Sequence, residues 1–236
     1  MKVRWRRLGV GLMWGLLGLL VFSISVVTVL RWIDPPGSSF IGQTWIGGWI
    51  QGRDRPWVRH EWVPWEDIAP AVPLAVVAAE DQRFPEHLGF DRVELEKAWR
   101  NYRKTGRLRG ASTLSQQVAK NLFLWGGRSI VRKGCEAWFT LLIELTWSKQ
   151  RILEVYLNIA QFGPYTYGVG AASWRYFDRP PALLTEGEAA LLAAVLPNPE
   201  LYRLDAPSVY VQRRAAWVRK QMRQLGSGYL DGLASN

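Results

Sequence analysis

Two adjacent carboxylates, Glu80 and Asp81, end an apolar run within the stretch AAEDQRFPEHLGFD at residues 78–91. One residue advances a helix by about 100°, so the two side chains face different surroundings. A glutamate at the C-terminal end of an apolar helix loses solvent and meets the negative end of the helix dipole. Both effects raise its pKa toward the range of a general base. Asp81 is expected to accept hydrogen bonds from backbone N–H groups in the turn before Pro85, and His87 is expected to be structural. The alternative is that Glu80 simply ends a surface helix.

A second stretch, GASTLSQQVAKNLF at residues 110–123, places polar side chains in two rows along one helix face. Amides and hydroxyls suit hydrogen bonding to a sugar, and an ammonium group suits a phosphate. The opposite face is apolar, and the alternative for the polar face is simple solvation. The residues of the two rows are Ser112, Gln116 and Lys120, and Thr113, Gln117 and Asn121.

Cations gather in the third stretch, RSIVRKGCE at residues 128–136, where Glu136 lies one helical turn after Arg132. This pair is either an ordinary helix salt bridge or part of a diphosphate site. In the second case Arg128, Arg132 and Lys133 receive the diphosphate, and Glu136 orients a cation or binds a metal.

The surrounding pattern predicts a mainly α protein without repeats and without a strand pattern strong enough for a sheet. Apolar residues at helical spacing predict helices over 128–147 and 148–159, the latter capped by Ser148. Ser112 or Thr113 can cap the helix that runs to about Phe123. In the 148–159 helix, Glu154 and Asn158 share a face and are expected to support the site. The sequence TEGE at 185–188 is a capping box that opens a further helix, and a basic amphipathic helix follows Pro207.

The N-terminal segment predicts a membrane anchor, because residues 8–30 form 23 consecutive positions without a charge. Basic residues precede it, so the positive-inside rule puts residues 1–7 in the cytoplasm and the residues after about 34 outside. A cleaved signal peptide is the alternative. Residues 31–66 are expected to be a juxtamembrane linker, and residues 67–236 the functional domain.

Composition narrows the class of partner. The net charge is +10, and residues 92–109 alone hold seven basic and two acidic side chains with Trp99 and Tyr102 between them. Such a segment suits an anionic membrane or nucleic acid, and the predicted outside location argues against nucleic acid. Fourteen tryptophans also favour a membrane interface. A single cysteine excludes an intramolecular disulfide, and with two histidines it makes a cysteine-ligated zinc site implausible.

Together these stretches resemble the motifs of the peptidoglycan glycosyltransferases, glycosyltransferase family 51. The family patterns E-D-x-x-F-x-x-H-x-G, G-x-S-T-x-x-Q-Q-x-x-K-N, R-K-x-x-E and I-L-E-x-Y-L-N stand here as EDQRFPEHLG, GASTLSQQVAKN, RKGCE and ILEVYLN, in the same order. The resemblance covers roughly residues 65–205. It is closest to the monofunctional form, which lacks a transpeptidase domain.

The resemblance implies a lysozyme-like α-helical fold and the polymerisation of lipid II into glycan strands with release of undecaprenyl diphosphate. It implies that Glu80 is the catalytic base and that Glu136 is a second essential carboxylate. Lys120 and Arg128 match the diphosphate-contacting positions. Asp81, Phe84 and His87 belong to the first motif and are expected to shape the site. No covalent cofactor is expected, and the resemblance implies that a divalent cation, Mg²⁺ or Mn²⁺, can bind at the diphosphate, as in some members.

The same resemblance implies a location in the bacterial inner membrane with the catalytic domain in the periplasm. It also implies binding of moenomycin, which mimics the lipid-diphosphate donor. Lipid II, the growing lipid-linked glycan and the membrane are the expected partners, and proteins of cell wall synthesis or division are candidates. Two rival functions are a membrane-anchored, lysozyme-like enzyme that cleaves glycans and a non-enzymatic module that binds anionic lipid.

Overall fold

The computed structural model describes residues 2–50, 57–106, 112–127 and 129–233, and most of these are helical, as predicted. The helices are α1 (Lys2–Val29), α2 (Ser39–Ile50), α3 (Ala71–Glu80), α4 (Arg92–Thr105), α5 (Leu114–Phe123), α6 (Ile130–Thr146), α7 (Lys149–Ile159), α8 (Val169–Phe177), α9 (Glu186–Val195) and α10 (Val209–Leu225). Short 3₁₀ turns are η1 (Trp65–Asp67), η2 (Phe84–Glu86) and η3 (Pro181–Leu183).

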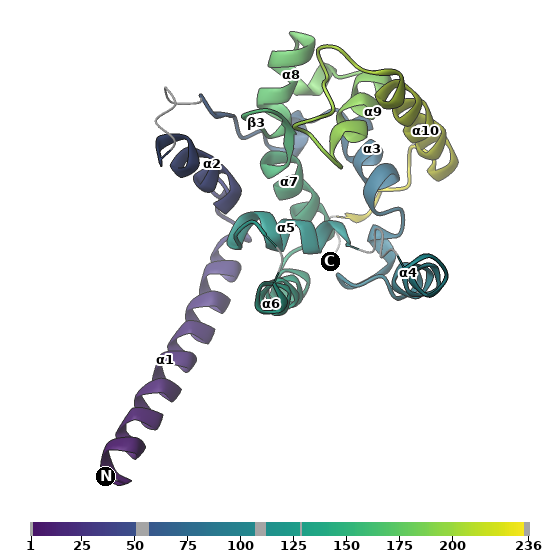
Figure 1. The fold of residues 1–236 in the computed structure, drawn as a ribbon. Coiled ribbons are helices and arrows are strands. Elements are labelled where there is room, and N and C mark those ends of the chain that lie inside the picture. The colour runs from purple at the N-terminus through teal and green to yellow at the C-terminus, as the bar shows by residue number, and fades with distance from the viewer. Residues whose placement is uncertain (1, 51–56, 107–111, 128, 234–236) are drawn as a thin grey trace.

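Helix α1 projects away from the rest of the chain (Figure 1). Its span Val10–Val29 is long and apolar enough to cross a membrane. Its last turns contact α6 and the residue that follows it: Trp138 Nε1 donates to Ser23 Oγ at 3.1 Å, and Trp147 Nε1 donates to the Val27 carbonyl at 2.8 Å. The arrangement therefore fits a membrane anchor whose C-terminal end is fixed to the domain.

Helix α3 lies at the centre of the core because it is apolar on every side. Its residues from Val72 to Ala78 are all buried. It packs against α9 and α10, whereas α5 packs between α6 and α7. The buried helix α3 therefore positions Glu80, its last residue, between α5 and α10.

The predicted caps are confirmed. The hydroxyl of Thr113 accepts from the backbone N–H of Gln116, and the Gln116 side chain returns the bond, so α5 begins with a capping box. Ser148 caps α7, and Thr185 with Glu188 forms the capping box of α9. These local bonds satisfy N–H groups that have no partner within the helix.

Two features differ from the sequence prediction. The expected linker 31–66 contains α2, SFIGQTWIGGWI, in which pairs of apolar residues are separated by Gly-Gln-Thr and by Gly-Gly. Three short strands also pair in the order β1-β3-β2, with β1 parallel and β2 antiparallel to β3. They are β1 (Arg59–His60), β2 (Gln161–Gly163) and β3 (Thr166–Tyr167). Each is too short to give an alternating pattern that a sequence could reveal.

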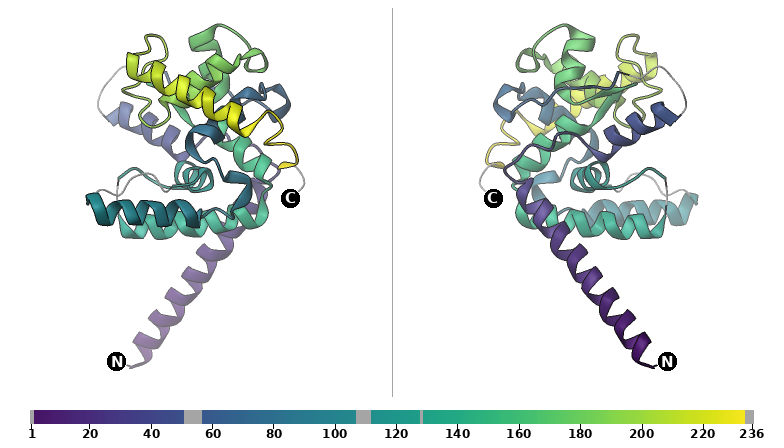
Figure 2. Two further views of the ribbon diagram at one scale, coloured as in Figure 1. Left: turned by 90° about the vertical axis from the view of Figure 1, so that its right-hand side faces the viewer. Right: turned by 90° about the vertical axis from the view of Figure 1, so that its left-hand side faces the viewer.

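The helices form two groups that enclose the end of α3. In the views of Figure 2, α8, α9 and α10 lie on the far side from α1, whereas α4 and α6 lie on the side from which α1 projects. Helix α4 exposes Trp99 and Tyr102, whose rings stack at 5.7 Å between centroids. The part of the domain nearest the predicted membrane is therefore basic and aromatic.

Candidate active site

Glu80 is held between two helices that are distant in sequence. Gln117 of α5 donates from Nε2 to Glu80 Oε2 at 3.2 Å, and Arg214 of α10 donates from Nη2 to Oε1 at 3.4 Å. Tyr156 of α7 donates its hydroxyl to Gln117 Oε1 at 3.1 Å, which turns the amide nitrogen of Gln117 toward the carboxylate. Each oxygen of Glu80 therefore has one donor, and the side chain has a fixed orientation.

Burial raises the pKa of Glu80 above its ordinary value, because a charged carboxylate is less stable away from water. The hydrogen bond from Gln117 and the charge of Arg214 act in the opposite direction and keep the ionised form accessible. A carboxylate with a raised pKa and partial exposure suits a general base near neutral pH.

Asp81 has a separate role at the start of the following turn. Its Oδ1 accepts from His87 Nε2 at 2.9 Å, and its Oδ2 accepts from the backbone N–H of Leu114 at 2.9 Å. The expected backbone partner in the turn before Pro85 is wrong, because the backbone donor is the first residue of α5. The hydrogen bond from His87 agrees with the structural role expected for it. Asp81 thus connects the end of α3 to the start of α5.

Asp91 completes a buried acidic group beside this link. Ligand atoms of Asp81, His87 and Asp91 lie within 4.8 Å of one another, as in some metal sites. However, Asp91 Oδ1 already accepts from the N–H groups of Val93 and Glu94 and lies 3.3 Å from Arg83 Nη1. Three of the four carboxylate oxygens in the group therefore have protein partners, and the group is a hydrogen-bonded support for the turn.

The phenylalanine of the first motif, Phe84, is fully buried beneath this turn. The ammonium of Lys149 lies 4.5 Å from the centre of its ring and pairs with Glu144 at 2.9 Å, while it also bonds the His87 carbonyl. A buried ion pair between α6 and α7 therefore holds the turn from below.

The polar residues of α5 divide into two groups. Thr113 and Gln116 are buried in the capping box, and the Thr113 hydroxyl also donates to the Gly89 carbonyl at 2.6 Å. Ser112 is exposed and lines the pocket beside Glu80. The other three residues of the two polar rows, Gln117, Lys120 and Asn121, are half-buried. The structure gives Thr113 and Gln116 a structural function, and substrate binding by any of these residues stays a prediction.

Lys120 belongs to a cationic group formed by α5 and α6. Burial lowers the pKa of Lys120, and the nearby charges of Arg132 and Lys133 lower it further, whereas Glu136 raises it. Glu136 is buried and pairs with Arg132 Nη1 at 2.9 Å and with the ammonium of Lys133. Both of its carboxylate oxygens contact cations, which favours cation orientation among the roles expected for Glu136. Arg128 lies outside the described residues.

Glu154 and Asn158 hold the segment before α3 rather than contacting Glu80. Glu154 Oε1 accepts from the Trp65 N–H at 3.1 Å. Asn158 is fully buried and exchanges two hydrogen bonds of 2.8 Å with the backbone of Val63. The supporting role expected for them is therefore indirect.

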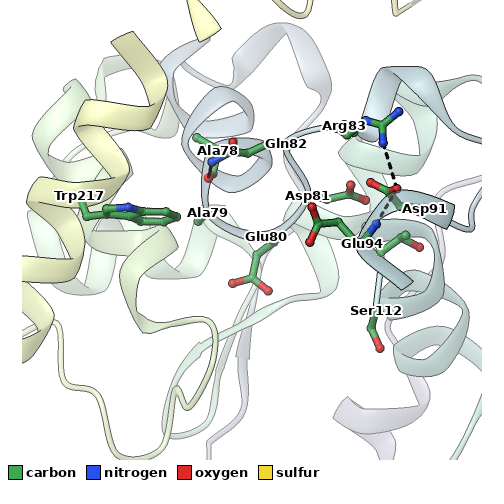
Figure 3. Close-up of a pocket in the computed structure, with 11 residues that line it drawn as sticks. Ala78, Ala79, Glu80, Asp81, Gln82, Arg83, Asp91, Glu94, Ser112 and Trp217 are labelled. Carbon is green, nitrogen blue, oxygen red and sulfur yellow. Dashed lines mark hydrogen bonds and ion pairs between the residues drawn. The ribbon is translucent and has the colours of Figure 1, made fainter. Parts of the chain in front are cut away.

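A pocket of about 270 Å³ opens beside Glu80 (Figure 3). Its lining residues are Ala78, Ala79, Glu80, Asp81, Gln82, Arg83, Asp91, Glu94, Ser112, Thr113 and Trp217. Sequence reasoning missed Arg214 and Trp217, which α10 supplies. The sequence carries one indication of them, because Tyr210, Arg214 and Trp217 share one face of the helix predicted after Pro207.

Comparison with known proteins relates nearly the whole chain to one family. The family described as Transglycosylase matches residues 49–223. A biosynthetic peptidoglycan transglycosylase of Xanthomonas campestris pv. campestris (strain B100) is 51% identical over 230 residues, covering 96% of this chain and 94% of the relative. Proteins with the same name from Aeromonas hydrophila subsp. hydrophila and Pseudomonas syringae pv. tomato are 53% identical over 221 residues and 49% identical over 232 residues. These alignments cover 94% and 98% of this chain, and 93% and 96% of the relatives.

Proposed function

The chain belongs to the transglycosylase family, and on this premise we propose that it polymerises lipid II into linear glycan strands. The observation that carries the proposal is the placement of Glu80. It is a largely buried carboxylate that still reaches solvent and has a raised pKa, held by Gln117 and Arg214, beside a cationic group on α5 and α6. A base next to fixed cations is the arrangement that glycosyl transfer from a diphosphate requires.

In the proposed reaction, Glu80 takes the proton of the 4-hydroxyl on the acceptor's N-acetylglucosamine. The freed oxygen forms a bond to C1 of the donor's N-acetylmuramic acid from the side opposite the diphosphate. The bond from C1 to the diphosphate oxygen breaks, so the anomeric configuration changes from α to β. Undecaprenyl diphosphate leaves with the bonding electrons.

The leaving group gains negative charge, and we assign its stabilisation to Lys120, Arg132 and Lys133. Glu136 orients Arg132 and Lys133 through its two ion pairs. Fixed cations of this kind stabilise the transition state without reorganising during the reaction. The cations also disfavour the rival hydrolase, since a glycosidase typically uses a carboxylic acid to protonate its leaving oxygen, whereas a diphosphate leaving group needs cations.

A divalent cation at the diphosphate would supply further charge stabilisation. Glu136 does not fit as its ligand in this arrangement, because both carboxylate oxygens contact basic side chains. No step of the proposed reaction passes through a metal ion.

The membrane part of the proposal places α1 across the bacterial inner membrane with its N-terminus in the cytoplasm and the domain in the periplasm. The basic residues before the apolar span support this orientation. Helices α4 and α6 lie on the side of α1 (Figure 2), and α4 exposes basic and aromatic residues there. A lipid-linked substrate would then reach the site from the bilayer. Proteins of cell wall synthesis or division are candidate partners.

The test is polymerisation of fluorescent lipid II by the purified full chain in detergent, followed by gel separation of the glycan products. We expect strands that lysozyme digests, and none from Glu80→Gln, which keeps the size and shape of the side chain but cannot act as a base. Parallel reactions with and without a chelator test the metal. Full activity in Glu80→Gln contradicts the assigned base. Cleavage of finished peptidoglycan without polymerisation supports the rival hydrolase.

A further inference from the structure

The exposed face of α10 carries large aromatic side chains where a helix usually presents small polar or charged ones. Tyr210 and Trp217 are 53% and 44% exposed, and Arg214 lies between them on the same face. The neighbouring face, about 100° around the helix, is conventional, since Val211, Ala215, Val218 and Met222 pack into the core. Trp217 is therefore not required to fill the core, and its exposed indole is available to a ligand.

Trp217 is joined to the catalytic carboxylate through Arg214. The guanidinium carbon of Arg214 lies 5.9 Å from the centre of the Trp217 ring, and the same guanidinium donates to Glu80. The indole and Glu80 also line one pocket, into which they reach from α10 and α3 (Figure 3). One turn further along α10, Gln221 accepts from Gln82 Nε2 at 3.0 Å, which fixes α10 against the segment that follows Glu80.

We propose that Trp217 is the sugar-binding platform of the acceptor. The N-acetylglucosamine ring whose 4-hydroxyl gives its proton to Glu80 lies with its apolar C–H face on the indole, and Tyr210 extends the platform. A pyranose ring has such an apolar face, and a tryptophan offers a large flat surface for burying it. This inference rests on the proposed function.

The two sides of Glu80 distinguish acceptor from donor. Gln117 of α5 contacts Oε2, and α5 also carries Lys120 of the cationic group that suits the donor's diphosphate. Arg214 contacts the other oxygen from α10, which carries the aromatic residues. The donor therefore occupies the side of α5 and α6, and the acceptor sugar the side of α10.

The experiment uses the full chain and a lipid II whose 4-hydroxyl is capped, so that it can serve only as donor. With this donor saturating, the concentration of an uncapped acceptor is varied, and the reverse titration gives the KM of the donor. We expect Trp217→Ala to raise the acceptor KM about tenfold and the donor KM less than about twofold. Trp217→Phe should restore most of the loss. Trp174→Ala removes a tryptophan of similar exposure, 47%, from α8 and should change neither KM.

Thermal melting of each variant checks folding. An unchanged acceptor KM in folded Trp217→Ala, or equal increases of both KM values, overturns the inference. A second readout does not need activity: the indole N–H signal of Trp217, assigned by its loss in Trp217→Phe, should shift on addition of an N-acetylglucosamine disaccharide. If the wild type fails to polymerise, the proposed function is wrong, and this signal alone decides whether Trp217 binds sugar. No shift then overturns the inference.

Discussion

The carboxylates of Glu80 and Asp81 are neighbours in the chain but contact different partners. Glu80 accepts from Gln117 and Arg214, two side chains at the site, whereas Asp81 accepts from His87 and from the backbone of α5. The helix ends between them, so the two carboxylates point in different directions although both residues line the same pocket (Figure 3). One residue is thereby free for proton transfer while the next fixes the position of the turn.

Replacing Glu80 with glutamine is expected to remove activity and to stabilise the fold near neutral pH. Burial raises the pKa of Glu80, so the folded protein binds this proton more tightly than the unfolded chain. The free energy of unfolding of the wild type therefore falls as pH rises from the ordinary value of 4.5 through the raised folded-state value. Above this pH window the ionised carboxylate lowers the free energy of unfolding, and Glu80→Gln removes that destabilisation.

Melting temperatures of wild type and Glu80→Gln measured from acid to neutral pH check this expectation. The variant should melt higher at neutral pH, and the difference should shrink below the ordinary glutamate pKa. Asp81→Asn is the matched control with the opposite sign. Its amide would face the donors of His87 and Leu114, each 2.9 Å from the buried Asp81 carboxylate. The donors to Glu80 lie farther away, at 3.2 and 3.4 Å, and that carboxylate reaches solvent. We expect Asp81→Asn to lose about 1–3 kcal/mol. A less stable Glu80→Gln at neutral pH contradicts the burial argument.

Arg214 is expected to set the acid limb of the pH–rate profile. Its charge lowers the pKa of Glu80 and partly offsets the effect of burial. Arg214→Gln removes that charge, so the pKa of Glu80 rises further and the base remains protonated to a higher pH. The acid limb of kcat/KM should therefore move to higher pH. Arg213→Gln is the control, because it removes the same charge from the adjacent position. If both variants moved the acid limb equally, the effect would come from the net charge of α10 and not from the contact of Arg214 with Glu80.

Lys120 is expected to contribute to the donor's diphosphate site. Lys120→Met keeps the length of the side chain and removes the ammonium, so the leaving group loses a fixed cation. We expect kcat/KM to fall on the order of a hundredfold and the binding of moenomycin to weaken. Lys220→Met, on the exposed side of α10, is the control with the same chemical change. Normal moenomycin binding by Lys120→Met would place the diphosphate elsewhere.

The sequence predicted features that depend on neighbouring residues and missed those that depend on distant ones. The caps at Thr113 and Ser148 are local, and so is the separation of Glu80 from Asp81, because helix geometry determines them. Arg214 reaches Glu80 across 134 residues. Tyr210, Arg214 and Trp217 share a helix face, but no short pattern indicates which distant residue that face contacts. Helix α2 was missed for a related reason: it lacks an amphipathic pattern and is fixed by α5, where Gln43 Nε2 donates to the Leu124 carbonyl at 3.0 Å.

Gly89, the last residue of the first motif, is expected to tolerate no side chain. Its φ is +78°, and a Cβ there would lie 2.6 Å from Thr140 Cγ2 and 2.9 Å from Glu144 Cγ. Strain and overlap together should cost Gly89→Ala more than about 2 kcal/mol. Its carbonyl also accepts from Thr113, so any shift of Gly89 would disturb the start of α5 and the link through Asp81.

Gly134→Ala is the matched control, because Gly134 lies within α6 and a Cβ there meets nothing within 4 Å. Alanine should stabilise that helix by about 0.5–1 kcal/mol. Chemical denaturation of both variants should therefore give changes of opposite sign. Equal stability of Gly89→Ala and the wild type would mean that the turn can move away from α6. The position of Asp81, and with it the orientation of Glu80, would then not depend on the close approach of Gly89 to Thr140.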